Sequence, residues 1–250
     1  MSLVPDCLQL CTEKFTHYSN SGIWLFNCSV ENFLKLVPDE TFDAIITDPP
    51  YEINFSDQYK YKEQNEEIFF ALEKEWYRVL KKDSWFVFWW SVKRIPDISR
   101  FRKLTYKWQI ISEFPSTVSK CFCGERTYAP IFVYTKGEPK AKYRRQDKIY
   151  AEELPIVSGR MGLRDFKPTI SWAQLLSIFT DENSWIFDPF AGFGGFALVC
   201  KLFGRKYVGT ERDEVRFKVA TMILEENKIS NTRAKLDELV YPNTREKGLF

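Results

Sequence analysis

Several features that mark other classes of protein are scarce or absent in this 250-residue chain. It contains one histidine, His17, and six cysteines with no CxxC pair, so we expect reduced thiols and no metal site. No uncharged run approaches the roughly 20 residues that cross a bilayer, and residues 1–10 carry no basic leader. We therefore expect no membrane span, no secretory signal and a cytoplasmic location. The formal net charge is only +2, so a polyanionic partner would have to be held by local basic patches.

The composition instead fits a chain with a sizeable apolar core. Apolar residues make up 44% and aromatic residues 17% of the sequence, which argues against disorder. The length suits one large α/β domain, so we expect a single domain over residues 1–250. Residues 136–166 are charged and weakly patterned, which predicts a short insertion embedded in that domain.

Apolar runs bounded by turn residues predict strands, and apolar residues at helical spacing predict helices. The predicted strands are 23–26, 43–48, 85–90, 109–114, 130–135, 185–187 and 207–210. The predicted helices are 30–37, 66–80, 95–103, 169–180, 196–203 and 215–227. This alternation predicts a mostly parallel sheet with helices on both faces, and the strands 109–114 and 130–135 are expected to be antiparallel. Residues 52–64 lack periodicity and predict a loop over the functional site.

The string Asp48-Pro49-Pro50-Tyr51 ends the second predicted strand, where open α/β sheets bind ligands. The exocyclic amino group of adenine or cytosine is a poor nucleophile, because its lone pair is delocalised into the ring. The Asp48 carboxylate and the Pro49 carbonyl can accept both amino hydrogens and so localise that lone pair. Prolines stiffen the backbone, and Tyr51 offers a face on which an extruded base can stack. The string therefore predicts methyl transfer to a base amino group without a metal.

A second string, Asp188-Pro189-Phe190-Ala191-Gly192-Phe193-Gly194-Gly195, joins the predicted strand 185–187 to the helix 196–203. Glycines permit positive φ and close approach of a ligand, and a helix N-terminus offers unpaired N–H groups. Glu211 lies 19 residues beyond Gly192, where an acid commonly binds the ribose hydroxyls of a nucleoside cofactor. The string does not read G-x-G-x-x-G, as dinucleotide sites do. It resembles instead the S-adenosylmethionine turn of amino-methyltransferases.

With Asp-Pro-Pro-Tyr placed ahead of the glycine string, residues 20–228 resemble the β-class DNA amino-methyltransferases. The resemblance implies an α/β, Rossmann-like methyltransferase fold with a mixed seven-stranded sheet and a circularly permuted order of motifs. It also implies S-adenosyl-L-methionine as cofactor and double-stranded DNA as substrate, with the target base flipped out. Relatives are often dimers, so a homodimer is expected, whereas a partner restriction endonuclease is left open.

The resemblance also assigns roles to individual residues. Catalysis is assigned to Asp48, Pro49, Pro50 and Tyr51. Cofactor binding is assigned to Asp188, Pro189, Phe190, Ala191, Gly192, Gly194 and Glu211, to the preceding Lys167-Pro168 pair, and to Cys28 and Ser29, which replace the Gly-Asp of many members. Nucleic-acid binding is assigned to the basic residues of the insertion, where the family commonly carries target recognition: Lys136, Lys140, Lys142, Arg144, Arg145 and Lys148.

The choice of base follows from the first residue of the catalytic string. Asp48 favours the N6 amino group of adenine, because N4-cytosine enzymes more often carry serine at that position. We therefore expect a site-specific DNA adenine-N6 methyltransferase. Two alternatives stay open: an N4-cytosine DNA methyltransferase, and a catalytically silent DNA-binding subunit of the same fold, which the missing acid at Cys28-Ser29 allows.

Overall fold

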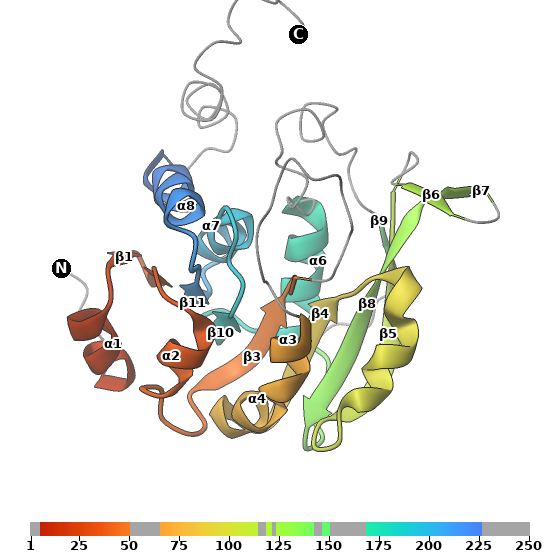
Figure 1. Cartoon of the computed structure of the whole chain (residues 1–250), viewed down its shortest axis with the longest axis horizontal. Helices are drawn as coiled ribbons and strands as arrows, with labels where there is room; N and C mark the ends of the chain where they lie inside the picture. The colour runs from red at the N-terminus through yellow and green to blue at the C-terminus, as the bar shows by residue number, and fades with distance from the viewer. Residues whose placement is uncertain are drawn as a thin grey trace, which may run out of the picture.

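The computed structural model describes residues 6–50, 66–114, 119–121, 124–142, 147–150 and 169–226. These residues form one large twisted sheet with helices on both of its faces (Figure 1). The sheet contains nine strands in the order β1-β2-β11-β10-β3-β4-β8-β5-β9, and a separate hairpin pairs β6 with β7. Among the helices in these ranges, none combines the length and apolarity needed to cross a bilayer.

The strands are β1 (His17–Asn20), β2 (Ile23–Phe26), β3 (Phe42–Thr47), β4 (Leu80–Trp89), β5 (Thr105–Glu113), β6 (Ser119–Cys121), β7 (Gly124–Arg126), β8 (Tyr128–Lys136), β9 (Lys148–Tyr150), β10 (Trp185–Asp188) and β11 (Lys206–Thr210). The helices are η1 (Asp6–Leu8), α1 (Gln9–Lys14), α2 (Val30–Leu34), α3 (Glu66–Ala71), α4 (Glu73–Val79), η2 (Val92–Arg100), α6 (Thr169–Phe179), α7 (Gly195–Leu202) and α8 (Glu214–Glu226). Of these, η1 and η2 are 3₁₀ helices.

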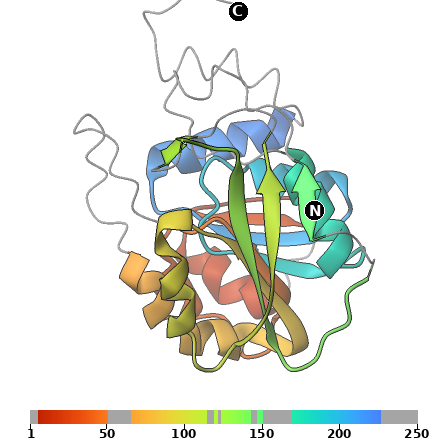
Figure 2. The ribbon, with the colours of Figure 1, turned by 90° about the vertical axis from the view of Figure 1, so that its right-hand side faces the viewer.

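The sheet is mixed, as predicted. Strands β2, β11, β10, β3 and β4 are parallel, and β8 is antiparallel to both of its neighbours, β4 and β5. In the order across the sheet, the seven strands that begin with β2 and end with β5 are the seven that the sequence predicts. Two further strands were not predicted: β1 pairs with β2 at one edge, and β9 pairs with β5 at the other, which faces the viewer in Figure 2.

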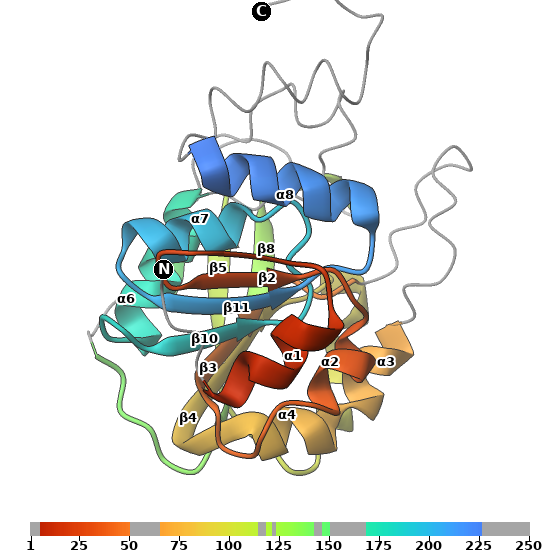
Figure 3. The same cartoon turned by 90° about the vertical axis from the view of Figure 1, so that its left-hand side faces the viewer.

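The central strands of the sheet are buried on both faces, and apolar side chains point to both sides. In β3, Ala44 and Ile46 belong to one core cluster, while Ile45 belongs to the other. Such unbroken apolar runs are typical of parallel strands covered by helices. Helices α6, α7 and α8 cover the first face, and α1, α2, α3, α4 and η2 cover the second (Figure 3).

Three predicted helices differ from those observed. The helix predicted at 66–80 is divided into α3 and α4, because Leu72 leaves helical geometry between them. The helix predicted at 95–103 is η2, which begins at Val92 and is kinked at Arg94. Its Pro96 has no N–H group to donate, which disfavours a regular α-helix there. The helix predicted at 30–37 ends at Leu34, and the predicted loop 52–64 lies outside the described residues.

The connections around β3 and β10 diverge to opposite faces of the sheet. From β3 the chain reaches β4 through α3 and α4 on one face, and from β10 it reaches β11 through α7 on the other. The two strands are neighbours and parallel. Their carboxyl ends therefore flank a switch point, the place where open α/β sheets form a binding crevice.

Candidate functional site

The two strings singled out in the sequence meet at this switch point. Strands β3 and β10 pair with Ala44 opposite Ile186 and Ile45 opposite Phe187. Asp48 follows the end of β3 and the glycine string follows the end of β10, so both emerge at the same edge of the sheet. Two segments about 140 residues apart in the sequence therefore lie at one edge of the sheet.

Asp188, the first residue of the glycine string, faces the interior of the sheet. It is 2% exposed, and its Oδ1 accepts hydrogen bonds from Thr47 Oγ1 at 2.7 Å and Phe190 N at 3.2 Å. Its Oδ2 accepts a third from the hydroxyl of Tyr207 at 3.0 Å. Burial raises the pKa of Asp188 to about 7, the nearby Asp48 carboxylate adds to the rise, and the three hydrogen bonds oppose it.

The glycine turn uses two of its glycines for different purposes. Gly192 and Gly194 both have a positive φ, +54° and +76°, a backbone conformation that residues other than glycine rarely adopt. A Cβ on Gly194 would lie 2.8 Å from the Cβ of Ala220 in α8, so Gly194 also lets α7 and α8 approach each other. A Cβ on Gly192 would meet nothing within 4 Å, so the backbone there is open to an approaching molecule.

Glu211 follows β11 and links that strand to the glycine turn. Its Oε2 accepts a hydrogen bond from Gly192 N at 3.0 Å, and its Oε1 accepts one from Asp213 N at 2.8 Å. The residue is 4% exposed, and burial raises the pKa of its carboxyl group, although the two N–H donors and Arg216 counter this. Each carboxylate oxygen has further acceptor capacity, so Glu211 can still bind hydroxyl groups of a ligand.

A shallow pocket opens to solvent beside Glu211 at this edge. Six of the residues that line it were predicted as site residues: Cys28, Ser29, Pro50, Pro189, Phe190 and Glu211. The sequence did not indicate the other five: Val30, Glu31, Ile68, Thr210 and Arg212. Apolar side chains beside a buried carboxylate suit a ligand with a flat ring and a sugar.

Cys28 and Ser29 stand where the resemblance places an acidic residue. Burial raises the pKa of Cys28 to about 12, so its thiol stays neutral. The Ser29 hydroxyl caps α2 by accepting a hydrogen bond from Asn32 N at 3.4 Å. The nearest carboxylate on the same segment is that of Glu31, which also lines the pocket.

The remaining predicted residues around the turn divide into three groups. Ala191, Gly192 and Gly194 form the turn but do not belong to the described pocket lining, and neither does Asp188. Asp48 is half-buried and Pro49 is buried at the end of β3. Tyr51, Lys167 and Pro168 lie outside the described residues. In the part of the chain that the structure describes, no cluster of three or more His, Cys, Asp or Glu side chains is arranged to hold a metal.

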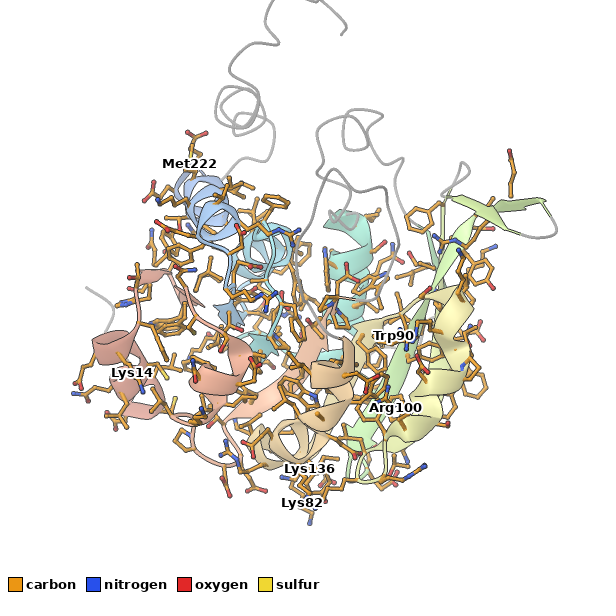
Figure 4. The ribbon with its side chains drawn as sticks, in the orientation of Figure 1. Lys14, Lys82, Trp90, Arg100, Lys136 and Met222 are labelled. Carbon is orange, nitrogen blue, oxygen red and sulfur yellow. The ribbon has the colours of Figure 1, made fainter. Side chains whose placement is uncertain are left out.

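The basic residues predicted to bind nucleic acid do not lie together. In the register of β8 with β4, Lys136 stands opposite Ser84. Ser84 lies level with the start of β3 in the neighbouring pair. At about 3.3 Å per residue Lys136 is roughly 17 Å along the strands from Asp48. Figure 4 labels it beside Lys82 at this far end of the sheet. Its ammonium donates to the Leu80 carbonyl at 2.6 Å and to Glu40 at 3.3 Å.

Lys142 lies at the same far end. Its backbone N–H donates to Ile178 near the end of α6, and its side chain pairs with Asp181, which precedes β10. Lys140 is exposed between Lys136 and Lys142. These three residues therefore lie away from the carboxyl edge that holds Asp48, because here the chain runs around the amino end of the sheet.

Lys148 is the exception. It lies on β9 opposite Ile111, close to the carboxyl end of β5, and pairs with Glu113 at 2.7 Å. Arg144 and Arg145 lie outside the described residues.

Comparison with known proteins identifies the family. The sequence profile of the DNA methylase family, the N6/N4 methyltransferases, matches residues 42–222, which include both strings and Glu211. The chain therefore belongs to the DNA methylase family.

Individual relatives agree with this assignment. A protein of Escherichia coli (strain K12) named "Putative methylase YubD" is 27% identical over 180 residues, which cover 70% of this chain and 78% of YubD. The crystal structure of the M1.HpyAVI–SAM complex is similar with a TM-score of 0.61 and 20% identity, covering 81% of this chain and 98% of that one. The PvuII DNA methyltransferase (cytosine-N4-specific) is similar with a TM-score of 0.66 and 15% identity, covering 89% and 94%. These structures confirm the predicted methyltransferase fold.

Proposed function

We propose that this DNA methylase transfers a methyl group from S-adenosylmethionine to the N6 amino group of an adenine flipped out of double-stranded DNA. The observation that carries the proposal is the pairing of β3 with β10. This pairing brings Asp48 to the same edge of the sheet as the glycine turn and the Glu211 pocket.

The residues around the pocket fit S-adenosylmethionine. Glu211 is held by two backbone N–H groups and keeps acceptor capacity for ribose hydroxyls. Val30, Ile68 and Phe190 offer apolar surface to an adenine ring, and the open backbone at Gly192 allows a ligand to lie against it. The bound cofactor supplies a methyl group on a positively charged sulfonium. We propose that Lys167 and Pro168 complete the methionine end of the site.

The catalytic string activates the target nitrogen. The Asp48 carboxylate and the Pro49 carbonyl accept hydrogen bonds from the two amino hydrogens. The nitrogen lone pair is then localised on the nitrogen and no longer delocalised into the ring. A bond forms from nitrogen to the methyl carbon while the carbon–sulfur bond breaks. The proton that the nitrogen then loses passes to Asp48 or to water, and the negative charge of Asp48 stabilises the positive charge that develops before this loss. Tyr51 stacks on the flipped base.

Contact with DNA is proposed for the later part of the insertion. Lys148 lies near the carboxyl end of β5, so it is better placed to reach phosphates beside the site than Lys136, Lys140 and Lys142. We propose that Arg144 and Arg145, which precede Lys148 in the sequence, also bind DNA. We assign target recognition to this part of residues 136–166 and propose that two copies of the chain form a dimer on DNA.

The test uses the purified full-length chain, unmethylated plasmid DNA and methyl-tritiated S-adenosylmethionine. The DNA is digested to nucleosides, and the labelled product is identified by chromatography and mass. N6-methyladenine is the expected product. N4-methylcytosine without N6-methyladenine would support the cytosine alternative, and DNA binding without any label in the DNA would support a silent subunit.

A further inference from the structure

Hydroxyl groups from the strands on both sides hold the carboxylate of Asp188. Thr47, on the catalytic strand β3, donates to Oδ1 at 2.7 Å. Tyr207, on β11, donates to Oδ2 at 3.0 Å. These two bonds connect three adjacent strands directly beneath the site, and all three residues are almost completely buried.

A glycine on β11 makes room for the Tyr207 hydroxyl beside Asp188. Gly209 stands opposite Asp188 in the pairing of β10 with β11. A Cβ on Gly209 would lie 2.5 Å from the hydroxyl of Tyr207, so any side chain there would displace it. Burial and the neighbouring Asp188 raise the pKa of Tyr207 well above its ordinary value, so the hydroxyl keeps its proton and acts as the donor.

The cofactor side of the site is held by a different set of bonds. Ala191 N donates to the Thr210 carbonyl at 3.0 Å, and Thr210 Oγ1 donates to the Pro189 carbonyl at 2.7 Å. Gly192 N donates to Glu211. All of these bonds join the turn to β11 and its end, and none of them involves β3. One further turn residue, Phe190, donates its backbone N–H to Asp188 Oδ1 at 3.2 Å, the oxygen that also accepts from Thr47. Removal of the Thr47 hydroxyl leaves the three bonds to β11 in place and removes neither atom of the Phe190 bond.

We propose that Asp188, together with Thr47 and Tyr207, is a positioning unit that fixes Asp48 against the glycine turn, and that Asp188 does not bind the cofactor. The inference rests on the proposed methyl transfer. Thr47 directly precedes Asp48 in the chain. The hydrogen bond from Thr47 to Asp188 therefore sets the distance between the carboxyl ends of β3 and β10. Misplacement of a reacting group by about 1 Å can cost about 100-fold in rate.

The experiment compares three threonine variants of the full-length chain. Thr47→Val removes the hydroxyl and keeps the shape, and Thr47→Ser restores the hydroxyl. Thr135→Val is the matched control, because Thr135 is also fully buried and donates at 2.9 Å to the Gly137 carbonyl, but at the far end of β8. For each variant, kcat for methyl transfer to DNA, the Kd of S-adenosylmethionine by calorimetry and the Tm are measured.

We expect Thr47→Val to lower kcat by about 10- to 100-fold, with the Kd of S-adenosylmethionine within about twofold of the wild type. Thr47→Ser should recover most of kcat, and Thr135→Val should keep kcat near the wild-type value even where its Tm falls as far. Equal kcat in Thr47→Val and Thr135→Val would overturn the inference, as would a loss of cofactor affinity that parallels the loss of kcat. A wild-type chain that transfers no methyl group would refute the proposed function itself.

Discussion

Gly192 and Gly194 stand two residues apart in one turn, and the same substitution should affect them differently. A side chain in left-handed geometry costs roughly 1–2 kcal/mol, and this cost applies to alanine at either position. At Gly194 the new Cβ would also lie 2.8 Å from the Cβ of Ala220 and 3.2 Å from its Cα. Overpacking of this kind costs a further 1–3 kcal/mol, roughly. We therefore expect Gly194→Ala to lower the free energy of unfolding by about 2–5 kcal/mol, and Gly192→Ala by about 1–2 kcal/mol.

Cofactor binding should separate the two variants in the opposite sense. The Cβ of Gly192→Ala would occupy open space over the turn, where we place S-adenosylmethionine, so this variant should lose affinity while it remains folded. Gly194→Ala removes no open surface. At a temperature where it is still folded, its affinity should change less than that of Gly192→Ala.

Urea unfolding followed by circular dichroism measures the stabilities, and calorimetry measures the cofactor Kd. The double variant Gly194→Ala/Ala220→Gly provides a control, because removal of the Ala220 methyl relieves the closest contact. It should be more stable than the sum of the single changes predicts, by about 1–3 kcal/mol. Equal destabilisation by the two glycine substitutions, or strict additivity in the double variant, would refute the packing argument.

Three further outcomes follow from the carboxylates and the basic residues. Glu211→Gln should raise the Kd of S-adenosylmethionine at least about 10-fold, because an amide nitrogen cannot accept a hydrogen bond from Gly192 N or Asp213 N; an unchanged Kd by calorimetry would contradict this. The pKa of Asp188 is raised from 3.8 to about 7, so its contribution to stability is fully present below about pH 4 and is lost as the pH rises through 7. The unfolding free energy of the wild type minus that of Asp188→Asn should fall by about 1.4 kcal/mol per pH unit between pH 5 and 7, and a flat difference in urea titrations would exclude it. Lys148→Gln should reduce the salt dependence of DNA binding by about one unit of slope, whereas Lys136→Gln should leave it unchanged; equal slopes would count against the proposed DNA surface.

Much of the fold followed from apolar patterns. Strand β2 was predicted with its observed bounds, and β3 within one residue at each end, because both are short apolar runs bounded by polar residues. The helix predicted at 66–80 illustrates the limit. Its apolar residues keep helical spacing across Leu72, and no glycine or proline marks the break that divides α3 from α4.

The place of the site was predictable for a topological reason, since parallel strands put their carboxyl ends at one edge. The partners of Asp188 were not predictable in this way. Thr47 and Tyr207 are single hydroxyl-bearing residues inside buried strands, and a sequence does not reveal which carboxylate lies across the strand from them. The sequence shows that Lys136 and Lys142 belong to a basic segment, but it does not show where that segment runs. In the structure both residues lie at the amino end of the sheet, away from the site.

The most direct test of the account is Asp48→Ala, assayed for tritium transfer to DNA and for cofactor binding on the same preparation. We place Asp48 at the target amino group and the cofactor on the separate turn after β10. Methyl transfer should therefore fall by at least about 100-fold, while the Kd of S-adenosylmethionine stays within about threefold of the wild type. Transfer at a rate close to that of the wild type, or a loss of cofactor binding as large as the loss of transfer, would contradict the account.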